Sequence, residues 1–117
     1  MVTTITRDEL KAKLDRKERV FLIDALPERY YLEQHLPGAI NIPHDQVDAL
    51  APKLLPDPGA EIVVYCASGP CQNSGIAAHR LAQLGYTNVR DYHEGKKDWV
   101  EAGLPVESGP APARTAA

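Results

Sequence analysis

Two cysteines, Cys66 and Cys71, are the residues of this chain best suited to covalent chemistry. Cys66 directly follows the apolar run 61–65 and opens a loop of mainly small residues that leads into an amphipathic segment. Successive main-chain N–H groups of such a loop form an anion-binding nest, and the N-terminus of the following helix adds partial positive charge. Both effects favour the thiolate, which is the nucleophilic form of cysteine. The context therefore predicts that Cys66 is a nucleophile whose surroundings stabilise a persulfide anion.

The loop that follows Cys66 is the predicted cradle for that second sulfur atom. Pro70 has no N–H, so the cradle has one donor fewer than its length allows. Ser74 is also the expected N-cap of the next helix. The alternative for Cys66 is a small buried apolar residue without chemistry. The residues expected to bind substrate are Ala67, Ser68, Gly69, Pro70, Cys71, Gln72, Asn73 and Ser74.

Cys71 has three interpretations that the spacing leaves open. It is a resolving thiol that forms a disulfide with Cys66, a second sulfur carrier, or a loop residue packed against the body of the domain. Zinc binding with His79 or His93 is disfavoured, because the cysteine spacing is not typical of a zinc site and no second cysteine pair exists. We expect neither a metal ion nor an organic cofactor.

A phosphatase of the cysteine-dependent type is also disfavoured. Such enzymes clamp the phosphoryl oxygens with an arginine that would stand at position 72, which is Gln72 here. The first arginine after the loop is Arg80, well inside the following helical segment.

Alternating strand and helix patterns must position this loop. Thr6 and Glu9 have the spacing of a capping box, which predicts a helix start. Alternating elements of this kind predict a parallel sheet with helices on both faces. Strand 61–65 is the most hydrophobic and is the expected central strand. The strand patterns cover 20–24, 39–43, 61–65 and 89–92, and the helical patterns cover 7–16, 27–33, 45–55, 74–85 and 96–101.

Ligands bind such sheets at the carboxyl ends of the strands, so the residues that follow the strands are candidates for the site. Asp24 ends the first of these strands and is expected to orient the active loop through main-chain N–H groups. His44 and His93 follow strands at the same edge, and Lys96 and Lys97 stand on another loop there; they are possible rim residues. Solvated loop side chains are the alternative for the two histidines.

Composition restricts the class of protein. The chain has 117 residues, enough for one domain, and its net charge of −3 argues against nucleic-acid binding. No apolar run is long enough to cross a membrane, and residues 1–8 lack the features of a signal peptide, so a cytoplasmic location is expected. The Pro/Ala/Gly-rich end, 108–117, is predicted to be a flexible tail. No exposed apolar stripe stands out, which favours a monomer or a weak homodimer.

Several segments, taken in order, make the chain similar to the rhodanese-like family of sulfurtransferases. This resemblance implies a five-stranded parallel sheet with helices on both faces, spanning residues 1–107. It also implies a ping-pong reaction in which Cys66 takes sulfur from a donor, holds it as a persulfide between residues 67–73, and passes it to a thiophilic acceptor. Asp24 would lie beside the loop. The segments that carry the resemblance are 22–24, 28–43, 63–66, 81–89, 94–99 and 103–106.

The chain departs from the usual family pattern in its loop. The loop is two residues longer than the common form and resembles a variant, C-A-S-x-x-C-Q-x-S, found among bacterial single-domain members. Asn73 stands in place of the loop arginine, Leu26 in place of the arginine after Asp24, and Lys96 in place of a glycine. A cradle without arginine predicts weak use of dianionic thiosulfate and preference for a less charged persulfide, polysulfide or protein donor.

Three functions follow as hypotheses. The first is a sulfurtransferase that moves sulfane sulfur through a Cys66 persulfide, with a small-molecule or protein sulfur donor and a thiol acceptor as its partners. The second is a non-catalytic binding or regulatory module with the same fold. The third is a dithiol redox protein that uses Cys66 and Cys71.

Overall fold

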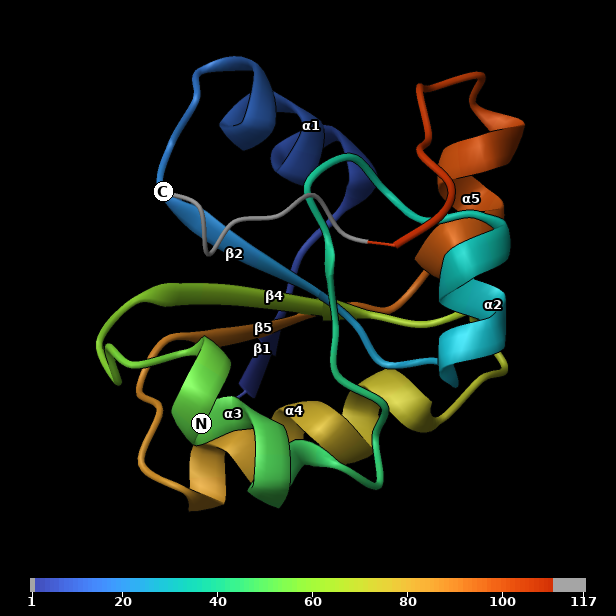
Figure 1. Ribbon diagram of the computed structural model, residues 1–117. Coiled ribbons are helices and arrows are strands. Elements are labelled where there is room, and N and C mark those ends of the chain that lie inside the picture. The colour runs from blue at the N-terminus through green and yellow to red at the C-terminus, as the bar shows by residue number, and fades with distance from the viewer. Residues whose placement is uncertain (1, 111–117) are drawn as a thin grey trace.

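A computed structural model describes residues 2–110 of the chain. Strands and helices alternate almost throughout, as the sequence predicts (Figure 1). The strands are β1 (Val2–Thr4), β2 (Val20–Asp24), β3 (Ile40–Asn41), β4 (Glu61–Tyr65) and β5 (Val89–Tyr92). The helices are α1 (Arg7–Asp15), α2 (Glu28–Glu33), α3 (Val47–Leu54), α4 (Asn73–Gln83) and α5 (Gly95–Glu101).

The strands form one five-stranded sheet in the order β1-β5-β4-β2-β3, and every pair is parallel. The predicted central position of β4 is confirmed, since β4 pairs with β2 on one side and with β5 on the other. The strand patterns did not include β1, a three-residue edge strand that pairs with β5. The sequence feature that indicates β1 is the run of β-branched residues 2–5.

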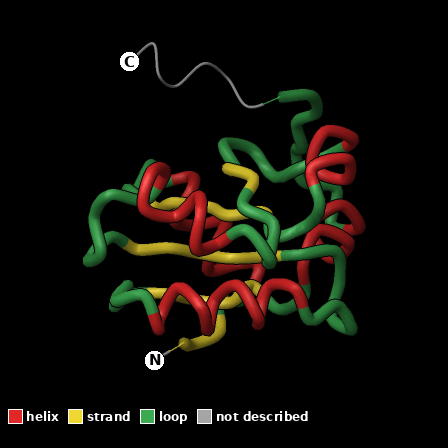
Figure 2. The backbone as a smooth tube through the Cα atoms, turned by 60° about the horizontal axis from the view of Figure 1, so that its bottom comes forward, coloured by secondary structure: helices red, strands yellow, loops and turns green. Residues whose placement is uncertain are grey.

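Helices cover both faces of the sheet, with α1, α2 and α5 on one side and α3 and α4 on the other (Figure 1). In Figure 2 the strands run side by side with helices flanking them. Side chains alternate along each strand, so neighbours enter different cores. In β4, Val63 and Tyr65 join the core that contains Trp99 of α5, whereas Ile62 and Val64 join the core that contains Leu81 of α4. This alternation directs Cys66, the next residue, toward the α4 side.

One local prediction about a helix end is confirmed. The capping box at α1 is present, because Thr6 N–H donates to Glu9 Oε1 at 3.0 Å and Glu9 N–H donates to Thr6 Oγ1 at 3.2 Å. Gly85 ends the α4 segment with a positive φ of 104°, a conformation that glycine adopts without steric cost. Its N–H donates to Ala82 O at 3.1 Å.

The chain end was predicted to be a tail over 108–117, of which 111–117 fall outside the described residues. Within the described part, Glu107 forms an isolated antiparallel bridge with His35, and Gly109 N–H donates to Leu32 O at 2.7 Å. None of the helices formed by residues 2–110 is long and apolar enough to span a bilayer.

Candidate active site

Cys66 lies at the carboxyl end of the central strand β4, where it begins the loop to α4. Its side chain is completely buried. The loop folds back over it, so that Cys66 Sγ donates to Cys71 O at 3.5 Å. A turn closed by a bond from Cys71 N–H to Ser68 O, at 3.0 Å, produces this fold-back. These two bonds bring the Cys71 carbonyl to the sulfur of Cys66.

Helix α5 anchors the start of the loop. The main-chain N–H groups of Lys96 and Lys97 donate to Cys66 O and Ala67 O, each at 2.8 Å. Within one trans peptide unit, the C=O of a residue and the N–H of the residue after it point in opposite directions. The N–H groups of Ala67 and Ser68 therefore point away from α5, which leaves them available to another acceptor.

Several loop N–H groups lack a protein acceptor. Within the described part of the chain, no acceptor bonds the main-chain N–H groups of Ala67, Ser68, Gly69, Gln72 and Asn73. A cluster of unpaired N–H groups in one short loop is what an anion-binding nest requires. That the loop is a cradle for a second sulfur atom stays a prediction.

The predicted ionisation of Cys66 is wrong for the loop as it stands. The pKa of the thiol is raised from 9.0 to about 11, first because the side chain is buried and second because its S–H donates to Cys71. The side chain and the main-chain N–H of Ser74 act in the opposite direction but do not compensate. Burial in apolar surroundings disfavours a thiolate. Burial and the bond to Cys71 therefore favour the thiol of Cys66 over the thiolate.

Ser74 has a different role from the predicted one. Helix α4 begins at Asn73, its N-cap is Gln72, and no side chain caps it, so Ser74 is not the N-cap. Instead Ser74 lies in the first turn with 1% of its surface exposed. Its hydroxyl has no full hydrogen bond to any described residue, yet it lowers the pKa of Cys66. The hydroxyl is therefore a hydrogen-bond donor beside the sulfur that has no acceptor among the described residues.

Asp24 does not orient the active loop, which corrects a second prediction. Its Oδ1 accepts from Leu26 N–H and its Oδ2 accepts from Tyr65 O–H, both at 2.9 Å. Tyr65 in turn accepts from Leu36 N–H at 3.0 Å. Burial raises the pKa of Asp24, whereas these two hydrogen bonds lower it. Asp24 thus forms a hydrogen bond with Tyr65, which precedes Cys66, rather than with the loop that follows Cys66.

Two cavities flank the active loop, one on each side. The first, of about 720 Å³, is lined by Gly69, Pro70, Cys71, Gln72, Gly75, Ile76, His79, Arg80, Gln83, Asp91 and His93. The second, of about 560 Å³, is lined by Leu26, Tyr30, Glu33, Gln34, Ala67 and Lys96. Cys66 lines neither, because the loop covers it. We call the first one the Cys71 cavity.

Of the four predicted rim residues, two line a cavity beside the loop and two do not. His93 lines the Cys71 cavity and Lys96 lines the second cavity. Lys97 and His44 line neither. Lys97 contributes its main-chain N–H to Ala67 instead, and the His44 N–H donates to Ala25 O at 3.1 Å. His79 and Arg80, which were not predicted as site residues, also lie in the Cys71 cavity.

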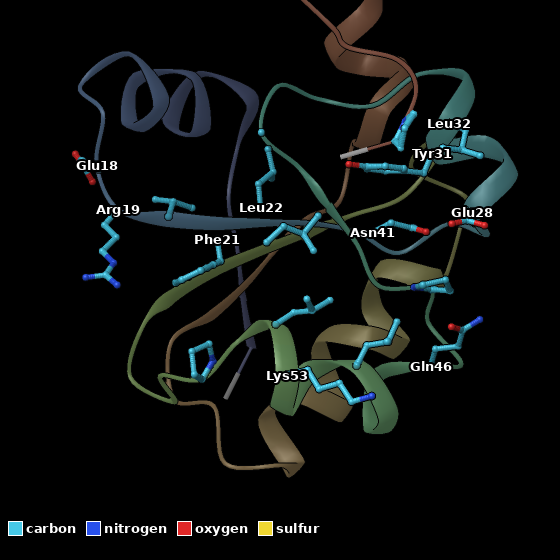
Figure 3. A pocket seen from close by; sticks show the side chains of 18 residues that line it. Glu18, Arg19, Phe21, Leu22, Glu28, Tyr31, Leu32, Asn41, Gln46 and Lys53 are labelled. Carbon is cyan, nitrogen blue, oxygen red and sulfur yellow. The ribbon is translucent and has the colours of Figure 1, made fainter. Parts of the chain in front are cut away.

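A larger cavity, of about 1010 Å³, lies elsewhere, between β2, α2 and α3 (Figure 3). The view shows Phe21, Leu32 and Lys53 around it, and no residue of the loop 66–74 lines it. Because it contains neither cysteine, we place the chemistry at the loop. Within residues 2–110, no group of three or more His, Cys, Asp and Glu side chains is arranged to hold a metal ion.

Comparison with known proteins agrees with this arrangement of sheet and loop. The family model of the Rhodanese-like domain matches residues 6–102. The chain belongs to the rhodanese-like family. A thiosulfate sulfurtransferase from Pseudomonas aeruginosa has a similar crystal structure, with a TM-score of 0.83 and 26% identity over 94% of this chain and 21% of that one.

Relatives with curated names differ in what they do. The HTH-type transcriptional regulator Rv0324 of Mycobacterium tuberculosis is 38% identical over 90% of this chain and 45% of its own length. The thiosulfate sulfurtransferase PspE of Escherichia coli is 36% identical over 59% of this chain and 64% of its own length. This chain thus spans less than two thirds of either relative. The family therefore includes both sulfur-transferring and regulatory proteins.

Proposed function

We propose that this protein is a sulfurtransferase that carries sulfane sulfur on Cys66. The observation that supports the proposal most directly is the loop over Cys66 Sγ, in which five main-chain N–H groups and the Ser74 hydroxyl have no hydrogen-bond partner among residues 2–110. These donors have no structural task in the empty loop. They are suited to an anionic sulfur atom attached to Cys66.

In the first half-reaction the sulfur of Cys66 attacks the outer sulfur of the donor, and a new S–S bond forms. The S–S bond of the donor breaks, and its remainder leaves with the electron pair of that bond and takes up the proton that Cys66 loses. In the resulting persulfide the negative charge lies on the outer sulfur, beyond the buried Sγ. The loop donors then bind a charge that the empty, protonated site does not contain.

The second half-reaction transfers that outer sulfur to a thiophilic acceptor. The acceptor attacks the outer sulfur, and the electron pair of the S–S bond returns to Cys66. The Cys66 thiol that remains is the form that burial favours, since its pKa is raised to about 11. Regeneration of the resting state is therefore favourable at neutral pH.

The donor is proposed to carry little negative charge. Arg80 is the nearest arginine to the loop, but its guanidinium is bound to both carboxylate oxygens of Asp48 at 2.6 and 2.7 Å. Lys96 Nζ donates to Gln34 O and Tyr30 O at 2.6 and 3.2 Å. Both cations already have partners, so a persulfide or polysulfide fits the site better than dianionic thiosulfate.

A regulatory module is the second candidate, supported by the similarity to the regulator Rv0324 and by the complete burial of Cys66. A transfer assay separates the two. The wild-type protein is expected to convert cyanide to thiocyanate with polysulfide as donor, and Cys66→Ser is expected to lose this activity. Equal, background-level activity of both proteins would favour the regulatory module.

A further inference from the structure

The two cysteines of the loop differ in access to the surroundings. Cys66 is completely buried and lines neither cavity beside the loop. Cys71 is partly exposed and lines the Cys71 cavity. A sulfur atom held on Cys66 is therefore covered, whereas one held on Cys71 lies at a cavity wall. The function proposed above leaves open how an acceptor reaches the covered sulfur.

We propose that Cys71 is a second sulfur carrier, which takes the outer sulfur from the Cys66 persulfide and presents it to a thiol acceptor in the Cys71 cavity. This inference rests on the proposed function, because it needs a persulfide on Cys66. It assigns a chemical task to Cys71 and an acceptor site to the cavity. The acceptor it implies is a low-molecular-weight thiol.

The fold of the loop brings the two residues together. Cys66 Sγ lies 3.5 Å from the main-chain oxygen of Cys71, although the residues are five positions apart. The turn from Ser68 O to Cys71 N–H holds this arrangement at one end, and the bonds from α5 hold the other. The transfer therefore takes place within one closed loop.

The Cys71 cavity has the size and the lining of a small-molecule site. Its volume of about 720 Å³ lies within the range of roughly 300–1,000 Å³ that is typical of ligand pockets. Polar side chains line it beside Cys71, among them His79, His93 and Gln72. Asp91 Oδ1 is buried there without a hydrogen-bond partner among the described residues. The side chains of Gln72, His79 and His93 are available to a polar acceptor, whereas the buried Asp91 Oδ1 is not exposed to it.

The transfer step is balanced without an oxidant or a reductant. Cys71 Sγ attacks the outer sulfur of the Cys66 persulfide, and a new S–S bond forms as the Cys66 S–S bond breaks. The electron pair of that bond stays on Cys66 Sγ, which takes up the proton released by Cys71. The product is a Cys66 thiol, the species that donates to Cys71 O in the structure. An acceptor thiolate then attacks the outer sulfur on Cys71 and leaves as a persulfide.

The test uses the full chain, loaded with sodium polysulfide and then mixed with glutathione. Persulfides are trapped by alkylation, and fragmentation mass spectrometry distinguishes the two cysteines, which are separated by four residues. In the wild-type protein we expect the added sulfur on both Cys66 and Cys71. We expect Cys71→Ser still to acquire sulfur on Cys66 but, once loaded, to deliver that sulfur to glutathione about tenfold more slowly or worse than the loaded wild type. Cys71→Ala provides a second variant, and its unfolding midpoint checks that the fold is intact.

The alternatives give different results. If Cys71→Ser delivers sulfur at the wild-type rate, the relay is wrong while the proposed function stands. A Cys66–Cys71 disulfide, seen as a loss of two hydrogen atoms, means that Cys71 attacks the inner sulfur and also contradicts the relay. Loading of Cys71 in Cys66→Ser as fast as in the wild type shows direct reaction with the donor, which again overturns it. If no protein acquires sulfur on Cys66, the proposed function itself fails.

Discussion

Gly95 lies against the main chain of Cys66, so closely that a Cβ atom at Gly95 would be 2.7 Å from Cys66 O. It would also be 2.8 Å from Ser68 N. The first turn of α5 thus rests directly on the start of the active loop, and only a residue without a side chain permits this. The position of Cys66 therefore depends on an element about 30 residues further along the chain.

We predict that Gly95→Ala disrupts the active loop. The added methyl group forces the loop and α5 apart, and the positive φ of 76° adds strain. The expected loss is roughly 3 kcal/mol in the free energy of unfolding, measured by urea denaturation, with a large loss of sulfur transfer. Gly103→Ala is the matched control, because Gly103 has the same φ of 76° but nothing within 4 Å of the added Cβ. Equal losses in the two variants would show that the contact with the loop is unimportant.

We predict that Cys66 of the unloaded protein remains a thiol at neutral pH. Burial and the bond to Cys71 raise its pKa to about 11, so the protonated form persists until well above pH 9. The Cβ chemical shift of isotope-labelled cysteine, followed by NMR across this range, measures the titration. Ser74→Ala is expected to raise the pKa further, because the hydroxyl lowers it. A midpoint below neutral pH would mean that the amides already stabilise a thiolate in the empty loop.

Asp24 is predicted to make the stability of the protein depend on pH. Burial raises the pKa of its carboxyl group above the ordinary value of 3.8 in the folded state. As pH rises from 3.8, the unfolded chain ionises first, so the contribution of Asp24 to stability falls until the folded carboxyl has also ionised. The difference in unfolding free energy between the wild type and Asp24→Asn should therefore be most favourable to the wild type at low pH. If the wild type instead became more stable relative to Asp24→Asn as pH rises, this result would contradict the raised pKa of Asp24.

The donor preference is the fourth prediction. The loop contains no arginine or lysine, and Arg80 and Lys96 already have partners, so we expect a lower kcat/KM for thiosulfate than for glutathione persulfide. The variant Asn73→Arg restores the cation at the position before Ser74, and it should raise kcat/KM for thiosulfate selectively, by about tenfold for one charge-assisted hydrogen bond. Thiosulfate preference in the wild type would show that another group supplies the charge.

Most of the architecture was predictable because it depends on local patterns. The capping box of Thr6 and Glu9, the apolar run of β4 and the C-terminal Gly85 each determine an element from neighbouring residues. Strand β1 was missed because three residues at a sheet edge leave a weak pattern, and its pairing with β5 involves residues far apart in sequence.

The loop after Cys66 follows a strand and precedes a helix, as predicted, but the Cys66 pKa is shifted in the direction opposite to the predicted one. That the small residues of this loop form a nest for a persulfide stays a prediction; several of its N–H groups have no acceptor among the described residues. The direction of the Cys66 pKa depends on burial beneath the loop and on the side chain of Cys71, and neither follows from residue types. The partners of Asp24 likewise depend on how close Tyr65 and Leu26 lie in the folded chain. Such three-dimensional contacts decide roles that spacing alone cannot assign.

The central claim is that Cys66 holds sulfane sulfur, and intact-protein mass spectrometry tests it most directly. The Cys71→Ser variant, treated with sodium polysulfide and freed of excess donor, is expected to gain one sulfur atom on Cys66, which cyanide then removes. The double variant Cys66→Ser, Cys71→Ser is the control and should gain none. If Cys71→Ser stays at its original mass while it remains folded, Cys66 carries no sulfur and the proposed function is contradicted.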